Sequence, residues 1–278
     1  AAAAAARAAN RATAAAAGTG GGGPAERAEA AQEEPMAQAA EKPTQPEAEK
    51  EPPERVEPRA PPAERPGMLV LVLGMPKCGT TSLHEAFLSA GLSSVHWALG
   101  AGQDLRADRE LRLWGTGVDQ RLIGRLMEQA AADGRPPLAL LPPGVNAVAE
   151  MNGLVWGRRE ARGHFPQISL LEELARHYPC AYFVLNVRDH NRWLRSVDSH
   201  NDLRRRLVSA ELPGLPRGAG ARDGELIAWV AAHHERVKAR LGGGRARLLV
   251  FDIERHGAQE LSAFLGRRVD WAVHNATR

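Results

Sequence analysis

The sequence predicts an α/β fold in which a parallel β-sheet is covered by helices on both faces. Three apolar runs carry this prediction, because a strand buried on both faces has no alternation of apolar and polar residues. The runs are Met68–Leu73 (MLVLVL), Ala181–Val187 (AYFVLNV) and Arg247–Asp252 (RLLVFD). Helical patterns separate them along the chain, and strands that alternate with helices favour a parallel sheet.

Residues 1–67 differ in composition from the rest of the chain and are expected to form a disordered tail. They contain Ala runs, a glycine tract and a Pro/Glu-rich stretch, with no aromatic residue and with Val56 as the only Val, Ile or Leu. Such a segment cannot bury enough apolar surface to offset its chain entropy. Residues 68–278 remain for one folded domain, a reasonable length for a single α/β unit.

The net charge divides at the same boundary. The tail has 8 basic and 11 acidic side chains, whereas the rest of the chain has 28 and 22. A basic domain attracts anionic ligands, although an ordinary solvated surface would give the same balance. The basic residues are not interleaved with aromatic ones, so no nucleic-acid groove is expected. No apolar run reaches 18 residues, so no membrane span is expected either.

Weaker patterns predict the remaining elements. Apolar residues at helical spacing, ended in several cases by glycine, predict helices. They are expected at Thr80–Ala90, Arg121–Ala132, Ile168–His177, Asn191–Arg206 with one break, Asp223–Leu241 and Gln259–Leu265. Short strands are expected at Ser93–Trp97, Leu138–Leu141 and Ala147–Glu150, and a loop is expected at Gly214–Gly220.

A glycine loop, Gly74–Ser82 (GMPKCGTTS), joins the first apolar run to the first helix. In this position a loop presents backbone N–H groups and a helix N-terminus to an anion. In the usual nucleotide-binding loop a lysine directly follows the second glycine and reaches the β- and γ-phosphates. Here Thr80 follows Gly79, and the lysine is Lys77. A lysine in the part of the loop before the second glycine is better placed to contact a single phosphate and the group that leaves it than to contact a triphosphate.

The segment PKCGTTSL resembles the 5′-phosphosulfate loop of the sulfotransferases, which commonly reads Pro-Lys-Ser-Gly-Thr-Thr. Cys78 stands in the place of the Ser. The resemblance implies a three-layer sheet of the P-loop type and 3′-phosphoadenosine 5′-phosphosulfate (PAPS) as co-substrate, with no metal required. It also implies that the donor is bound by Pro76, Lys77, Cys78, Gly79, Thr80, Thr81 and Ser82.

A second segment, LNVRDHNRWLRS, carries the other donor motif. In the family an Arg at a strand end and a Ser eight residues later hold the 3′-phosphate of PAPS. The resemblance places these roles on Arg188 and Ser196, while His190 stands where the family often has Pro. An ordinary ion pair of Arg188 with Asp189 or a nearby Glu is the alternative.

Sulfuryl transfer to a hydroxyl requires a group that accepts the proton. In the family this is a His or a Glu, which points here to His96 or Glu150, each at the end of an expected strand. His84 is a weaker candidate, and the pair His233–His234 is expected on the surface of a helix. Lys77 is expected to stabilise charge on the leaving oxygen.

The acceptor is expected to be a hydroxyl or amine of a carbohydrate or small molecule, in a pocket shaped by Gly100–Trp114 and Pro213–Gly220. Two alternatives stay open. One alternative is a divergent P-loop kinase or NTPase, because Asp252 ends a strand as the magnesium-binding acid of a kinase does. A non-catalytic nucleotide-binding module is the other. The position of Lys77 disfavours triphosphate chemistry, and Asp252 is expected to cap its own turn instead.

Overall fold

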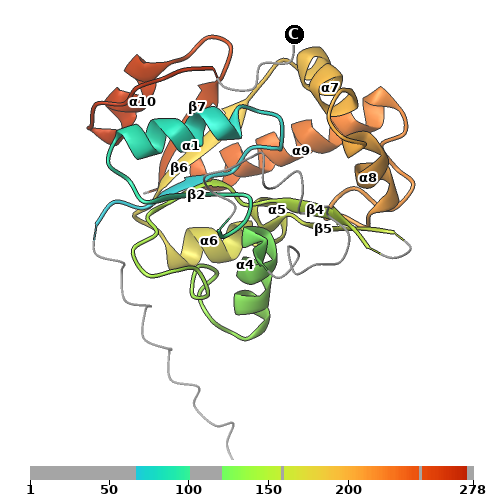
Figure 1. The fold of residues 1–278 in the computed structure, drawn as a ribbon, viewed down its shortest axis with the longest axis horizontal. Coiled ribbons are helices and arrows are strands. Elements are labelled where there is room, and N and C mark those ends of the chain that lie inside the picture. The colour runs from blue at the N-terminus through green and yellow to red at the C-terminus, as the bar shows by residue number, and fades with distance from the viewer. Residues whose placement is uncertain (1–66, 101–120, 158–159, 244–245, 274–278) are drawn as a thin grey trace, which may run out of the picture. The chain divides into compact units, whose positions relative to one another are not determined.

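The structure is a computed structural model that describes residues 67–100, 121–157, 160–243 and 246–273. Within these residues five parallel strands form one sheet in the order β2-β3-β1-β6-β7 (Figure 1). The strands are β1 (Val70–Val72), β2 (Ser94–His96), β3 (Ala147–Glu150), β6 (Tyr182–Val187) and β7 (Arg247–Asp252). The predicted α/β fold with a parallel sheet is therefore confirmed. The predicted tail lies outside the described residues, apart from Gly67.

Helices cover both faces of this sheet, as the sequence predicts. The first group is α1 (Thr80–Ser89) and α10 (Ala258–Leu265); the second is α4 (Ile123–Ala132), α6 (Leu171–His177) and α9 (Asp223–Leu241). Figure 1 shows α1 and α10 above the strands, with α4 and α6 below them.

The alternation of side chains along β1 shows why both faces are apolar. Val70 and Val72 pack with α1 and α10, whereas Leu71 packs in the cluster formed with α4, α6 and α9. Successive side chains of a strand point to opposite faces, so a strand between two helical layers must be apolar at every position. The run MLVLVL meets that requirement.

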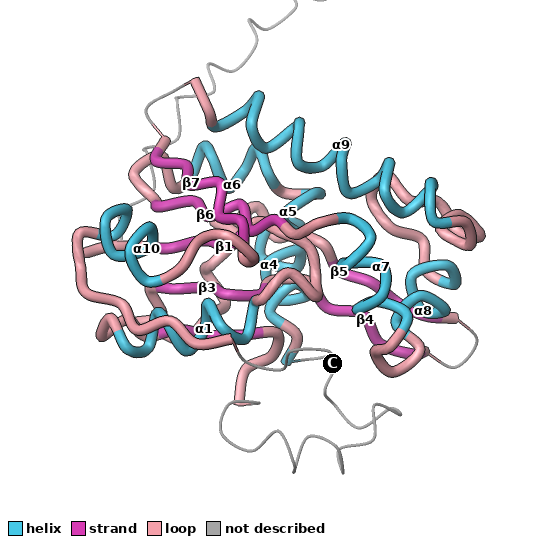
Figure 2. Tube along the Cα trace, turned by 90° about the horizontal axis from the view of Figure 1, so that it is seen from above, coloured by secondary structure: helices cyan, strands magenta, loops and turns pink. Residues whose placement is uncertain are grey.

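A second apolar cluster lies beyond the carboxyl ends of the strands. Its elements are β4 (Gly153–Trp156), β5 (Ala161–His164), α5 (Pro166–Ser169), α7 (His190–Asp198), α8 (Leu203–Ser209) and the start of α9. Figure 2 shows α7, α8 and the β4–β5 hairpin at one end of the row of strands. Met75 and Cys78 of the glycine loop are buried in this cluster. The cluster therefore supports the loop from beyond the sheet.

The structure corrects two of the predicted elements and adds one that was not predicted. Leu138–Leu141 is not a strand but a pair of turns, in which Leu141 N donates to Leu138 O. Prolines flank this segment on both sides and cannot donate to a strand ladder, which explains the difference. The antiparallel β4–β5 hairpin was not predicted. The helix predicted at Ile168–His177 starts earlier, at Pro166, and is divided at Leu170 into α5 and α6.

The predicted break in the basic helix Asn191–Arg206 is confirmed, because α7 ends at Asp198 and α8 begins at Leu203. Asn201 and Asp202 between them have positive φ angles, a conformation that ends helical geometry. No helix in the described ranges is long and apolar enough to cross a membrane.

Candidate active site

The glycine loop leaves β1 at the carboxyl edge of the sheet, where ligands bind in open parallel sheets. Asn186, a fully buried residue of β6, fixes its shape from below. Its Oδ1 accepts from Gly74 N at 2.8 Å, and its Nδ2 donates to Cys78 O at 2.7 Å. A Cβ at position 74 would overlap both oxygens of Asn186, so only glycine fits. One side chain thus clamps both ends of the bend.

The N-terminus of α1 faces the end of the loop. Gly79 has a φ of 75° and forms the N-cap, and no described side chain caps this end of the helix. The first turn also carries no acidic residue. Because uncapped N–H groups and the helix dipole attract anions, this end of α1 fits a phosphate or sulfate group.

Lys77 lies at the bend with a φ of 69°, which is unusual for a residue with a side chain. Partial burial lowers the pKa of its ammonium group, Glu150 acts to raise it, and Arg188 lowers it further. Cys78 is buried, and burial raises the pKa of its thiol to about 12. The thiol therefore stays protonated, and Cys78 is a small, neutral side chain that packs beneath the loop.

The second predicted motif lies beside the loop. Arg188 follows β6, and its guanidinium donates to Lys77 O at 3.3 Å and lies 3.4 Å from Glu254. Arg188 thus forms both the ion pair that was considered as its alternative role and a hydrogen bond to the loop. Trp193 of α7 donates from Nε1 to Pro76 O at 2.8 Å. Ser196 is buried one turn further along the same face of α7.

The two candidate bases, predicted as alternatives, lie side by side. His96 and Glu150 are register partners in the neighbouring strands β2 and β3, at an irregularity of the pairing. His96 Nε2 lies 2.8 Å from Glu150 Oε2. Thr80, the first residue of α1, donates from its hydroxyl to the same oxygen at 2.6 Å. The predicted donor loop and the predicted base therefore meet in one cluster.

Glu150 is the centre of this cluster. Burial alone would raise the pKa of its carboxyl group, but His96 and hydrogen bonds from His96, Thr80 and Asn152 outweigh burial and hold the pKa below its ordinary value. Glu150 is therefore ionised at neutral pH. Its negative charge in turn acts to raise the pKa of Lys77, so the two groups interact electrostatically.

The remaining histidine candidates lie in different surroundings. His84 contacts Ser94 through Nδ1 at 2.8 Å, and its ring lies 5.6 Å from that of His96. The surface position predicted for His233 and His234 is wrong, because both are buried. His233 Nε2 lies 2.6 Å from Leu73 O, at the end of β1. The helix α9 turns this polar pair toward the core.

Asp252 caps its own turn, as predicted. Its Oδ1 accepts from Glu254 N at 2.9 Å, directly after β7. Among the described residues, no group of three or more His, Cys, Asp or Glu side chains is arranged to hold a metal ion.

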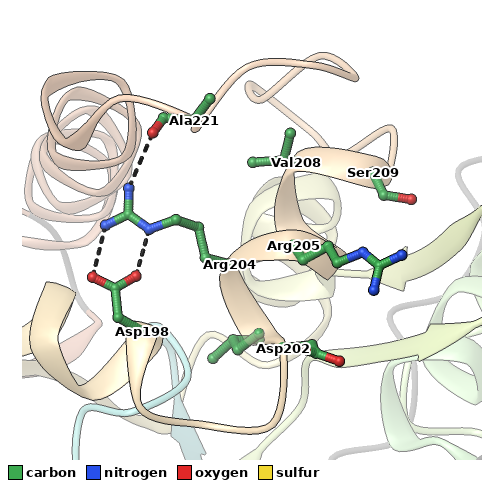
Figure 3. Close-up of a pocket in the computed structure, with 8 residues that line it drawn as sticks. Asp198, Asp202, Arg204, Arg205, Val208, Ser209 and Ala221 are labelled. Atoms are coloured by element: carbon green, nitrogen blue, oxygen red, sulfur yellow. Dashed lines mark hydrogen bonds and ion pairs between the residues drawn. The ribbon is translucent and has the colours of Figure 1, made fainter. Parts of the chain in front are cut away.

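An open pocket lies along α8 and is lined by none of the predicted site residues (Figure 3). Arg204 there pairs with Asp198 and Asp223 and donates to Gly220 O and Ala221 O. It therefore anchors the end of the predicted acceptor loop Pro213–Gly220. Of the other predicted acceptor loop, residues 101–114 lie outside the described residues.

Sequence reasoning missed the buried polar residues that support the site, chiefly Asn186, Asn152 and Gln167. For Asn186 a signal existed, because an amide inside the apolar run AYFVLNV must find a hydrogen-bond partner. Asn152 and Gln167 lie in segments whose packing was not predicted.

Comparison with known proteins identifies the family. A family model described as a sulfotransferase domain matches residues 69–273, which is most of the chain and includes both donor motifs. A search of curated proteins found no match. The chain therefore belongs to the sulfotransferase family.

Proposed function

We propose that this sulfotransferase uses PAPS as donor and transfers its sulfuryl group to a hydroxyl or amine of a carbohydrate or small-molecule acceptor. One observation carries the proposal. The anion-binding end of the loop and an ionised carboxylate meet at the Thr80–Glu150 hydrogen bond. This contact supports the proposal, because direct transfer requires the donor and the proton acceptor to be adjacent.

The donor would be held at two places. The N–H groups at the start of α1, with the hydroxyls of Thr81 and Ser82, would bind the 5′-phosphosulfate. Thr80 would join them through its backbone N–H, while its hydroxyl stays on Glu150. Arg188 and Ser196 would bind the 3′-phosphate, and Trp193 links the two places by holding Pro76. Fixing both ends of a substrate lowers the entropy lost on reaching the transition state.

When bound, PAPS supplies a sulfuryl group on a phosphate leaving group. Lys77 would neutralise the charge that the bridging oxygen gains as its bond to sulfur breaks. The pair Glu150–His96 would take the proton of the acceptor as its oxygen or nitrogen bonds to sulfur. Glu150 is the more direct proton acceptor, because it is ionised and lies next to the loop. His96 would then hold the carboxylate in place.

A thermal-shift screen followed by a transfer assay tests the proposal. Adenosine 3′,5′-bisphosphate should raise the melting temperature with increasing concentration, because it binds the folded state only. ATP with Mg²⁺ should raise it less, and stronger stabilisation by ATP would support the kinase alternative with Asp252 as metal ligand. Binding without any transfer from PAPS to a panel of hydroxyl and amine acceptors would instead support a nucleotide-binding module.

Two substitutions assign the base. Glu150→Gln keeps the shape but removes the proton acceptor, so transfer should fall by roughly 100-fold or more. His96→Asn should cost less, because the carboxylate remains. Glu85→Gln on the exposed side of α1 is the matched control. A larger loss in the His96 variant would make histidine the base.

A further inference from the structure

Two buried amide side chains lie behind Glu150. Asn152, in the short link between β3 and β4, donates from Nδ2 to Glu150 Oε1 at 2.8 Å. Gln167 of α5 lies behind Asn152, and its Nε2 contacts Asn152 Oδ1 at 3.2 Å. Asn152 is 4% exposed and Gln167 is fully buried. Neither amide therefore reaches the surface at which a substrate would bind.

These amides connect the carboxylate to the start of the glycine loop. Gln167 Nε2 also lies 3.4 Å from Gly74 O. At the other end of the loop, Thr80 donates to Glu150 Oε2. The hydrogen bonds thus run from Gly74 through Gln167, Asn152 and Glu150 to Thr80, so that they join both ends of the loop to the carboxylate.

Packing alone does not explain an amide at position 167. Its Oε1 is buried and has no hydrogen-bond partner among the described residues. An unpaired buried acceptor lowers stability, and an apolar side chain of equal volume would avoid that loss. The two contacts made by Nε2 are therefore the property that distinguishes glutamine from methionine here.

The network also fixes the carboxylate itself. Oε1 accepts from Asn152, while Oε2 accepts from Thr80 and faces His96. With both oxygens held, the carboxylate cannot rotate without breaking a hydrogen bond. The same donors keep it ionised against the effect of burial.

We propose that Asn152 and Gln167 are positioning residues for sulfuryl transfer, which hold the Glu150 carboxylate in a fixed place relative to both ends of the donor loop. This inference rests on the proposed function. Neither residue would touch donor or acceptor, so each would act on the rate through Glu150. Donor binding should depend on them only weakly.

The test compares Gln167→Met and Asn152→Asp with the wild type. Gln167→Met keeps the volume and removes both Nε2 contacts, so kcat should fall about tenfold, since small misplacements of reacting groups are costly. The Kd for adenosine 3′,5′-bisphosphate should stay within about twofold. Gln129→Met is the matched control, because the Gln129 side chain donates to Asp133 on the exposed side of α4, away from Glu150.

Asn152→Asp adds a change in pH dependence that a merely structural role would not produce. A second carboxylate beside Glu150 disfavours its ionised form. The acid limb of the kcat/KM profile should therefore move to higher pH, and kcat should fall about 100-fold. If this variant fails to fold, the Gln167→Met result decides alone.

The outcomes separate the two proposals. If the wild type transfers the sulfuryl group and the variants keep its kcat and pH profile, the positioning role is overturned while the proposed function stands. Equal losses of donor affinity and kcat would also overturn it, because the network would then act on the loop and not on the base. If the wild type neither binds adenosine 3′,5′-bisphosphate nor transfers a sulfuryl group, the proposed function fails and the inference falls with it.

Discussion

Trp193 Nε1 donates to the carbonyl oxygen of Pro76 at 2.8 Å, across 117 positions of the sequence. This bond joins the helix that contains Ser196 to the loop that contains Lys77. The ring is also 1% exposed and packs in the cluster beside the loop. The two proposed phosphate-binding places therefore share one buried connection.

Trp193→Phe should weaken donor binding by about two- to tenfold, because it removes this single neutral hydrogen bond and keeps most of the ring. Trp229→Phe is a matched control, since Trp229 Nε1 makes an equivalent bond to Pro213 O, away from the loop. Calorimetry with adenosine 3′,5′-bisphosphate gives the comparison. Equal weakening in both variants would show that the connection has no special role.

Arg188→Ala should weaken binding of adenosine 3′,5′-bisphosphate by about 10- to 100-fold, the value of a charge-assisted hydrogen bond. Binding of adenosine 5′-monophosphate should barely change, because it has no 3′-phosphate. Arg192→Ala is the control, since Arg192 also pairs with Glu254. If both ligands lose affinity equally in the Arg188 variant, the guanidinium acts through the fold alone.

Lys77→Met should lower kcat for sulfuryl transfer by about 100-fold or more, because one charge contact to the transition state is lost. The melting temperature should change little, since methionine can keep the buried part of the side chain. Lys238→Met, on the exposed face of α9, should leave kcat unchanged. Normal turnover of the Lys77 variant would remove this residue from the mechanism.

Gly74→Ala should lower the free energy of unfolding by about 2 kcal/mol and reduce donor binding, because the new Cβ displaces Asn186. Gly224→Ala is the matched control. Apart from its chain neighbours and the helix's own backbone, no described atom lies within 4 Å of a Cβ at position 224 in α9, so alanine there should be neutral or stabilising. Urea unfolding gives the loss of stability in each variant. Similar losses would contradict the role of Asn186 in fixing the loop.

His234 should make stability depend on pH. Burial, followed by the charges of His233 and His190, lowers the pKa of His234 to about 4, against 6.5 in the unfolded chain. The neutral form is therefore the folded form, and its contribution is complete above pH 6.5 and declines as pH falls toward 4. The loss approaches about 3 kcal/mol. In urea unfolding, His234→Gln should flatten this decline, and an unchanged slope would assign it to other groups.

Local patterns were sufficient to predict the five strands of the parallel sheet and the glycine loop, and they placed the candidates Arg188, His96 and Glu150 at strand ends. Each of these three lies at or directly after the end of a strand, where chain order alone determines the edge of the sheet. Ser196 lies within α7 and was indicated by the family resemblance. The pairing of His96 with Glu150 was not predictable in the same way. It depends on the register of β2 against β3, and that register shifts next to His96.

The wrong or missing predictions concern features that depend on contacts between distant segments of the chain. His233 lies too far along its helix to be placed from the sequence, and packing against β1 is what selects its buried position. The β4–β5 hairpin was missed because ARGH has no apolar alternation. Its strand is stabilised by pairing with GLVW and by packing against α8.

The clamp of Asn186 on Gly74 and Cys78 means that the proposed donor site is preorganised. The fold itself maintains the unusual backbone angle of Lys77, so a ligand does not have to supply energy to bend the chain. A site that exists before binding loses little conformational entropy when it is filled, and its apparent affinity equals its intrinsic one. The amide proton of Gly74, which is bonded to Asn186, should consequently exchange slowly with solvent even in the absence of nucleotide.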